Sequence, residues 1–109
     1  DSMEMNEISV KELNDRIKAG ENLKLVDVRE EFEYEICLIP GSIKIPLGQI
    51  SERFDEIDRL TPTVVICHHG RRSASAIEML KTKGFTNLIN LAGGVHEWAI
   101  EIDNEMATY

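Results

Sequence analysis

The sequence predicts an α/β fold built around a central parallel β-sheet. Short apolar segments rich in β-branched residues alternate with segments of helical periodicity, which is the order that parallel sheets require. The strongest strand signal, residues 63–67, carries no charge and is expected to be buried on both faces. With 109 residues, 42% of them hydrophobic, the chain is long enough for a single domain over residues 1–109. We expect residues 1–6 to be a tag remnant or flexible tail, and residues 101–109 to be a C-terminal tail.

The first part of the chain is predicted to form a helix followed by a strand. Ser9 has the character of a helix N-cap, and Glu12 follows three residues later, which is the spacing of a capping box. A helix is therefore expected over about residues 10–19, with Gly20 as its end. The apolar run 23–28 then predicts a strand that ends in polar residues.

The middle of the chain predicts two helices with a short strand between them. Residues 30–36 are expected to form a short helix that closes before the Ile-Pro-Gly turn at 39–41. A short strand follows at 43–45. Apolar residues at helical spacing then predict a helix over about 51–60, which Pro62 terminates.

The last part begins with the strongest strand, which is followed by a turn at residues 68–72. A helix is expected over 73–83 and is ended by Gly84, after which 88–91 form another short strand. A final helix opens at 93–94. Because ligands of parallel sheets bind beyond the carboxyl ends of the strands, the turn at 68–72 is the predicted place for a functional site.

The charge of the chain is strongly acidic but unevenly distributed. Twenty Asp and Glu residues against 12 Lys and Arg residues give a net charge of −8. This charge argues against nucleic acids and anionic membranes as partners, since both attract basic surfaces. Residues 59–77, however, contain no acidic residue and carry Arg59, Arg71 and Arg72. This window is therefore the candidate for binding an anion.

The cysteine content favours a reducing compartment. The two cysteines, Cys37 and Cys67, are far apart and belong to no Cys-x-x-Cys motif, so no disulfide framework is expected. The sequence contains no signal-peptide core and no apolar run of membrane-spanning length. We therefore expect a cytoplasmic protein.

The turn after the strongest strand has the features of an activated cysteine site. Cys67 ends the strand, a glycine-containing turn follows, and the next helix is expected to begin at Ser73. Backbone N–H groups in such a turn can form an anion-binding nest, and the helix adds its positive N-terminal end. Arg72 adds a fixed charge with paired donors. Each effect favours thiolate over thiol, so the pattern predicts a nucleophilic sulfur within an anion cradle rather than an inert core cysteine.

This turn resembles the active loop of the rhodanese-like sulfurtransferase family. Residues 67–73 read Cys-His-His-Gly-Arg-Arg-Ser, similar to the family's Cys-x-x-Gly-x-Arg-Ser loop. Three further segments resemble the family in the family's own order: Asp27-Val28-Arg29 with Glu33-Tyr34, then Ile39-Pro40-Gly41-Ser42, and finally Gly93-Gly94-Val95-His96-Glu97-Trp98. The resemblance covers roughly residues 7–100. It implies a parallel sheet flanked by helices on both faces.

The resemblance also implies an activity. Cys67 would accept a sulfane sulfur from thiosulfate or an organic persulfide and pass it to a thiol or cyanide acceptor. Arg72 would be its catalytic partner and hold the anionic donor or the persulfide. The implied substrate-binding residues are the others of the loop, His68, His69, Gly70, Arg71 and Ser73. The resemblance implies no metal and no organic cofactor, and we also consider a protein as the sulfur acceptor.

Two alternative functions stay open. Related phosphatases have a similar site but place five residues between cysteine and arginine, which makes room for phosphate. Here four residues separate Cys67 from Arg72, and the smaller cradle favours sulfur. The other alternative is a catalytically silent binding module, which the presence of both Cys67 and Arg72 disfavours.

Other polar residues are interpreted as structural. His68 and His69 are adjacent, and two arginines but no carboxylate lie nearby in the sequence, so they form a poor metal cage and are expected to line the loop. Asp27 and Arg29 are expected to form a structural charge pair. Turn, cap and core roles are expected for Gly93, Gly94 and Trp98.

Cys37 marks a departure from the family pattern. Cys37-Leu38 stand where the family usually has Gly-His before Ile-Pro-Gly. A small packing residue is the favoured interpretation of Cys37. The alternative is a resolving thiol that approaches Cys67.

Overall fold

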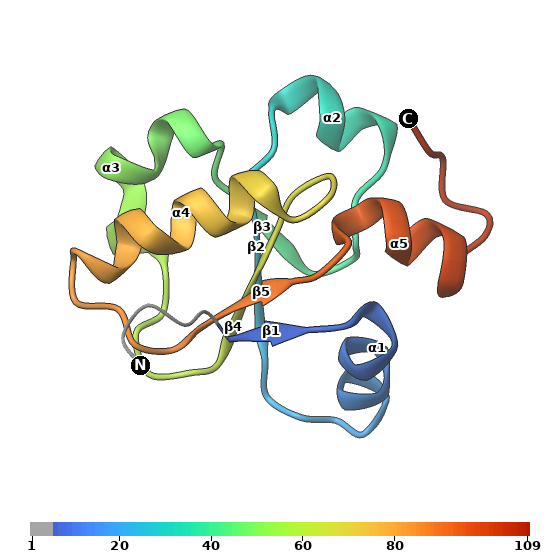
Figure 1. Cartoon of the computed structure of the whole chain (residues 1–109), viewed down its shortest axis with the longest axis horizontal. Coiled ribbons are helices and arrows are strands. Elements are labelled where there is room, and N and C mark those ends of the chain that lie inside the picture. Colours follow the sequence, from blue (N-terminus) through green and yellow to red (C-terminus); the bar gives the residue numbers. More distant parts are fainter. Residues whose placement is uncertain (1–5) are drawn as a thin grey trace.

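A computed structural model describes residues 6–109 and contains a five-stranded sheet (Figure 1). The strands are β1 (Glu7–Ile8), β2 (Lys24–Asp27), β3 (Ser42–Lys44), β4 (Thr63–Ile66) and β5 (Leu88–Leu91). Their order in the sheet is β1-β5-β4-β2-β3, and each pair of neighbours is parallel. The predicted α/β fold with a central parallel sheet is therefore confirmed. The prediction for residues 1–6 falls, apart from Asn6, outside the described residues.

Three helices and a broken helical segment connect the strands, and a fourth helix follows the last strand. The helices are α1 (Val10–Lys18), α2 (Glu31–Ile36), α4 (Arg71–Lys81) and α5 (Gly94–Glu101). Between β3 and β4 lie three short pieces: η1 (Leu47–Gln49), α3 (Ile50–Arg53) and η2 (Phe54–Glu56). No helix within residues 6–109 is both long enough and apolar enough to cross a membrane.

The predicted continuous helix over 51–60 is wrong. The segment changes between 3-10 and α geometry, and Ile57 is already extended, with φ −94° and ψ 131°. The Asp58 side chain then accepts hydrogen bonds from the backbone N–H groups of Leu60 and Thr61, at 2.7 and 3.2 Å. A side chain that satisfies these backbone groups locally competes with helix formation, so the chain turns here instead.

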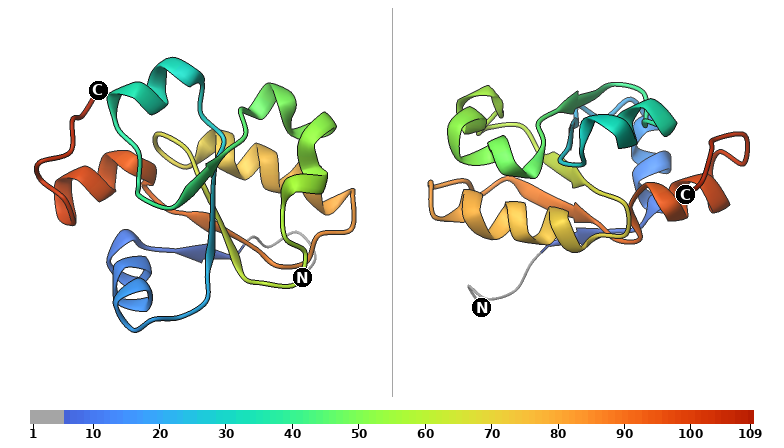
Figure 2. Two further views of the ribbon diagram at one scale, coloured as in Figure 1. Left: turned by 180° about the vertical axis from the view of Figure 1, so that it is seen from behind. Right: turned by 90° about the horizontal axis from the view of Figure 1, so that it is seen from above.

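Helices cover both faces of the sheet, and the residues of β4 together with Cys67 directly after it show why. Val65 and Cys67 pack into an apolar cluster with Ile77 and Leu80 of α4, whereas Val64 and Ile66 pack into a second cluster. That second cluster includes residues of α1 and α5. This alternation follows from the two-residue period of a strand. Figure 1 and the two views of Figure 2 show α3 and α4 on one side of the sheet and α1 and α5 on the other.

The carboxyl ends of the strands bring distant segments to one edge of the sheet. The turn after β4, the start of α2 after β2 and the start of α5 after β5 all lie there (Figure 1). The chain beyond α5 folds back toward this edge, with Met106 packed against the cluster on the α1 and α5 side. The fold therefore places the predicted cysteine turn beside α2, α5 and the last residues of the chain.

Candidate active site

Cys67 lies directly after β4, and the turn that follows is shaped by one glycine. The cysteine is only 1% exposed. Gly70 has φ +111°, in the left-handed region that favours glycine, and it forms the N-cap of α4. The helix consequently begins at Arg71, two residues before the predicted start at Ser73. Ser73 is therefore inside the first turn of the helix and points back to the cysteine.

The sulfur of Cys67 is held by two polar contacts. The backbone N–H of Gly70 donates to Sγ at 3.0 Å, and Ser73 Oγ lies 3.3 Å from it. Ser73 is fully buried and also donates to Asn90 Oδ1, while the Asn90 amide donates to the Gly70 carbonyl at 3.1 Å. This network ties the turn to β5, so the position of the sulfur is fixed by the sheet.

Arg72 uses both terminal nitrogens to bind a carboxylate of α2. Its Nη1 and Nη2 donate to the two oxygens of Glu33 at 2.6 and 2.7 Å. Tyr109 donates its hydroxyl proton to the same carboxylate at 2.6 Å, and Arg29 donates to the Tyr109 hydroxyl at 2.8 Å. The predicted catalytic arginine is thus part of a chain of hydrogen-bonded groups that links α4, α2 and Tyr109.

The arrangement shifts the pKa values of its members. The Arg72 guanidinium is the main cause that lowers the pKa of Glu33 to about 2, and the Tyr109 hydroxyl acts in the same direction against the effect of burial. Burial, followed by the hydrogen bond to Glu33, raises the pKa of Tyr109 to about 12. Glu33 is therefore ionised and Tyr109 protonated at neutral pH, which is the state that the hydrogen bonds require.

The Glu33 carboxylate is expected to stabilise the fold in a pH-dependent way. Its pKa is lowered in the folded state, so its contribution is complete above about 4.5, the unfolded value, and is lost as pH falls toward about 2. Glu33→Gln should lower the free energy of unfolding near pH 7 by about 1–3 kcal/mol, since Arg72 is partly screened by solvent. Chemical denaturation of both proteins between pH 7 and pH 2 measures this difference. If the difference in free energy of unfolding between the two proteins stays constant down to pH 2, the Glu33 carboxylate is not the source of the pH dependence.

Arg29 and Asp27 form a fully buried ion pair behind this chain. Arg29 Nη2 lies 2.7 Å from Asp27 Oδ2, and neither side chain is exposed. The same guanidinium donates to the carbonyl of Cys37 at 2.7 Å. Burial alone would lower the pKa of Arg29, but its bonds to Asp27 and Tyr109 outweigh that effect and raise it. The expected structural charge pair is confirmed.

A cavity of about 270 Å³ opens in front of the cysteine. Its lining consists of five of the predicted site residues, Cys67, His68, His69, Arg71 and Arg72. Gly70, in the turn, and Ser73, in the first turn of α4, contact the sulfur instead. The His68 ring stacks on Tyr109, with 3.9 Å between ring centroids and 5° between planes. Burial, followed by the neighbouring His69, lowers the pKa of His68, so this ring is mainly neutral at neutral pH.

The comparison with known proteins identifies the family of this fold and site. Residues 9–101 match the rhodanese-like domain family. The chain belongs to this family. It is 38% identical over 96 residues to the "Putative sulfurtransferase YtwF" of Bacillus subtilis (strain 168), an alignment that covers 88% of this chain and 92% of that protein.

This rhodanese-like domain spans different shares of two further relatives. The "Putative sulfur carrier protein YrkF" of the same Bacillus strain is 39% identical over 92 residues, which is 84% of this chain but half of YrkF. A crystal structure of a rhodanese-related protein from Thermoplasma volcanium has a TM-score of 0.80 and 36% identity. That match covers 89% of this chain and 93% of the other.

Cys37 of this rhodanese-like domain lies on the other side of the sheet from the active loop. It packs in the apolar cluster that includes residues of α1 and α5, whereas Cys67 packs in the cluster with α4. Both are unpaired thiols. This placement agrees with the favoured interpretation of Cys37 as a small packing residue and gives no support to direct attack on Cys67.

Three residues of the site were not predicted. Glu33 stood in the family-like segment Glu33-Tyr34 but received no role in the site. Asn90 is a nearly buried polar residue within the apolar run of β5, and such a residue signals a hydrogen-bonded position. Tyr109 lies far from the active loop in sequence, and no local pattern indicates its contact with Glu33. The site therefore extends beyond the loop to α2, β5 and the last residue.

Proposed function

We propose that this chain is a sulfurtransferase that carries a sulfane sulfur as a persulfide on Cys67. The observation that carries the proposal is the hydrogen bond from the Gly70 N–H to Sγ of Cys67, 3.0 Å long, because Cys67 is one of the residues that line the cavity. A backbone donor aimed at the sulfur stabilises negative charge there, which is what both the thiolate and its persulfide require. Arg71 and Arg72 both line the cavity. Arg72 is paired with Glu33, so the Arg71 guanidinium, which has no carboxylate partner among the described ion pairs, is the charge that favours an anionic donor.

The reaction consists of two displacements at sulfur. The Cys67 thiolate attacks the outer sulfur of thiosulfate, a new S–S bond forms, and sulfite leaves with the electron pair of the broken bond. An acceptor thiolate or cyanide then attacks the terminal sulfur of the persulfide. That S–S bond breaks, the Cys67 thiolate is restored, and the sequence of steps predicts ping-pong kinetics.

Several features support the choice of partners. An anionic sulfur donor fits the acid-free window, because a carboxylate there would repel it. The names of the relatives, a sulfurtransferase and a sulfur carrier, support sulfur as the transferred group, and a protein remains a candidate acceptor beside small thiols and cyanide. We propose no nucleic-acid or membrane partner, given the net charge of −8. A cytoplasmic location stays a prediction from the cysteine content.

The test is the mass of the intact protein after incubation with thiosulfate. We expect a gain of one sulfur atom that a reducing thiol removes. Cys67→Ser should show no gain, whereas Cys37→Ser, which changes the only other cysteine, should show the full gain. If neither thiosulfate nor an organic persulfide adds sulfur, the proposal is wrong and a catalytically silent binding module becomes the better hypothesis.

A further inference from the structure

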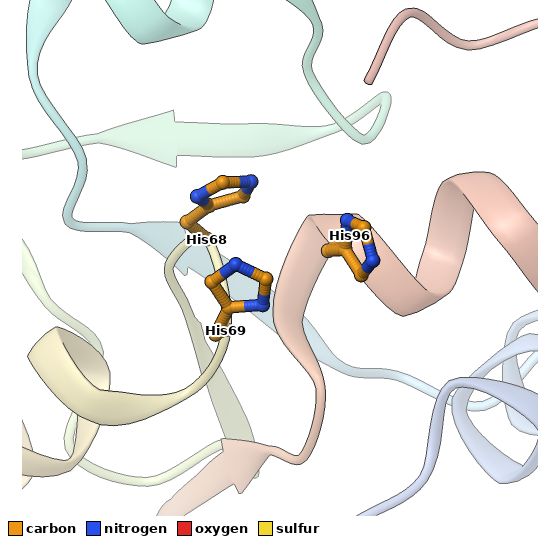
Figure 3. A group of neighbouring side chains, drawn as sticks. All are labelled: His68, His69 and His96. Carbon is orange, nitrogen blue, oxygen red and sulfur yellow. The ribbon is translucent and has the colours of Figure 1, made fainter. Parts of the chain in front are cut away.

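All three histidines of the chain lie close together, and two of them, His68 and His69, line the Cys67 cavity. His68 and His69 come from the turn after β4, and His96 comes from the first turns of α5 and faces them (Figure 3). One ring nitrogen from each lies within 4.8 Å of the others. Three histidines from two separate elements therefore converge on one small volume.

Two of these rings carry buried nitrogens that lack a partner within residues 6–109. They are Nε2 of His68 and Nδ1 of His96. Buried polar atoms are nearly always hydrogen-bonded, so two buried ring nitrogens without a partner in one cluster indicate that a ligand binds there. The His68 ring is stacked on the Tyr109 ring, with 3.9 Å between centroids, and this contact fixes the orientation of the His68 imidazole.

The backbone holds the two elements of the cluster in place. The N–H groups of Val95 and His96 donate to the carbonyls of Cys67 and His68, at 2.9 and 3.1 Å. The first turn of α5 is thus fixed against the active turn. His69 is exposed, so its ring is the one that can adjust.

Two features of the fold favour a cation beside these histidines. His68 and His69 are adjacent in sequence, but α5 supplies a third imidazole from a different direction. The charge of Arg72, which would repel a cation, is offset by Glu33 through two hydrogen bonds. Arg71 remains as the positive charge without a carboxylate partner in the described ion pairs.

We propose that His68, His69 and His96 bind a divalent cation of the zinc class at the mouth of the cavity. Neutral imidazoles suit Zn²⁺, Ni²⁺ and Cu²⁺. Tetrahedral zinc with Zn–N bonds of about 2.0–2.1 Å places its nitrogens roughly 3.4 Å apart, so nitrogens that are 4.8 Å apart must approach each other by about 1.4 Å. Because His68 and His69 also line the cavity, the bound cation narrows the path to Cys67, and the fourth coordination position stays open to solvent or to a donor anion.

Calorimetric titration with Zn²⁺ tests the site without any assay of sulfur transfer. We expect one Zn²⁺ per chain, and we expect His96→Gln and His69→Gln each to weaken binding by about tenfold or more. Because the His69 side chain is exposed, His69→Gln should not disturb the fold, so weaker binding in this variant cannot be attributed to misfolding. Cys67→Ser should bind Zn²⁺ as tightly as the unchanged protein. Zn²⁺ affinity in both histidine variants equal to that of the unchanged protein, or loss of binding in Cys67→Ser, would overturn the proposal.

Alkylation of Cys67 by iodoacetamide gives a second readout that is independent of the proposed activity. In a Cys37→Ser background the reaction reports Cys67 alone. Saturating Zn²⁺ should slow the alkylation in that background and leave its rate unchanged once His96→Gln is added. An equal effect of Zn²⁺ with and without His96 would show that the metal binds the thiol directly, and the proposed site would be wrong.

Discussion

Replacing Asp27 with alanine is expected to lower the free energy of unfolding by about 3–5 kcal/mol. The carboxylate and the Arg29 guanidinium are both fully buried and 2.7 Å apart. Asp27 Oδ1 also accepts from the backbone N–H of Arg29 at 3.0 Å. Alanine removes the counter-charge but leaves a buried cation, and the desolvation of that cation is then no longer compensated. Chemical denaturation at neutral pH measures the loss.

Two further variants separate the charge from the hydrogen bonds. Asp27→Asn keeps the shape of the side chain and one acceptor oxygen but removes the charge. The free energy of unfolding should therefore fall by less in Asp27→Asn than in Asp27→Ala. Glu12→Ala removes a carboxylate 2.7 Å from Arg16, but this pair is exposed, and a loss of about 0–1 kcal/mol is expected. If Asp27→Ala and Glu12→Ala lower the free energy of unfolding by similar amounts, burial does not make the Asp27–Arg29 pair more stabilising than the exposed Glu12–Arg16 pair.

The secondary structure could be predicted where the chain shows a long or unbroken pattern. The uncharged run of β4 and the periodic helix α4 were both located. β1 was not, because two residues are too few for a period to be visible. It forms only through its register with β5, where Glu7 pairs with Asn90 and Ile8 with Leu91. Such a strand is defined by its partner and not by its own sequence.

The candidate site was predictable only where it is contiguous in sequence. Cys67 and Arg72 could be assigned from the loop, since a strand end, a glycine and a helix start act together over a few residues. The partner of Arg72 could not, because Glu33 lies 39 positions away and reaches it only after α2 folds over the sheet edge. The role of an arginine that is expected to hold an anion changes once a carboxylate already occupies its paired donors. Tertiary contacts of this kind need the fold.

The contact between α5 and the active turn depends on one glycine. Gly94 has φ +58°, a conformation that disfavours side chains, and its α-carbon faces the backbone of the turn. A β-carbon at this position would collide with the carbonyl oxygens of Cys67 and His68 and would lie 2.6 Å from the carbonyl carbon of His68. These are backbone atoms that are also hydrogen-bonded to α5, so no side-chain rotation can relieve the collision. The turn itself has to move.

Gly94→Ala is therefore expected to reduce both stability and the reactivity of Cys67. Strain and overpacking together should cost about 2–5 kcal/mol, and a displacement of the sulfur by about 1 Å should slow sulfur loading from thiosulfate by roughly 100-fold. Gly20→Ala is the matched control, because Gly20 also has a positive φ, +79°, but no atom lies within 4 Å of the added carbon. It should lose about 1 kcal/mol through strain alone and load sulfur at the normal rate. Backbone strain is common to both variants, but only Gly94→Ala brings a side chain against the backbone of Cys67. Equal rates of sulfur loading in the two variants would therefore mean that the turn does not depend on its contact with α5.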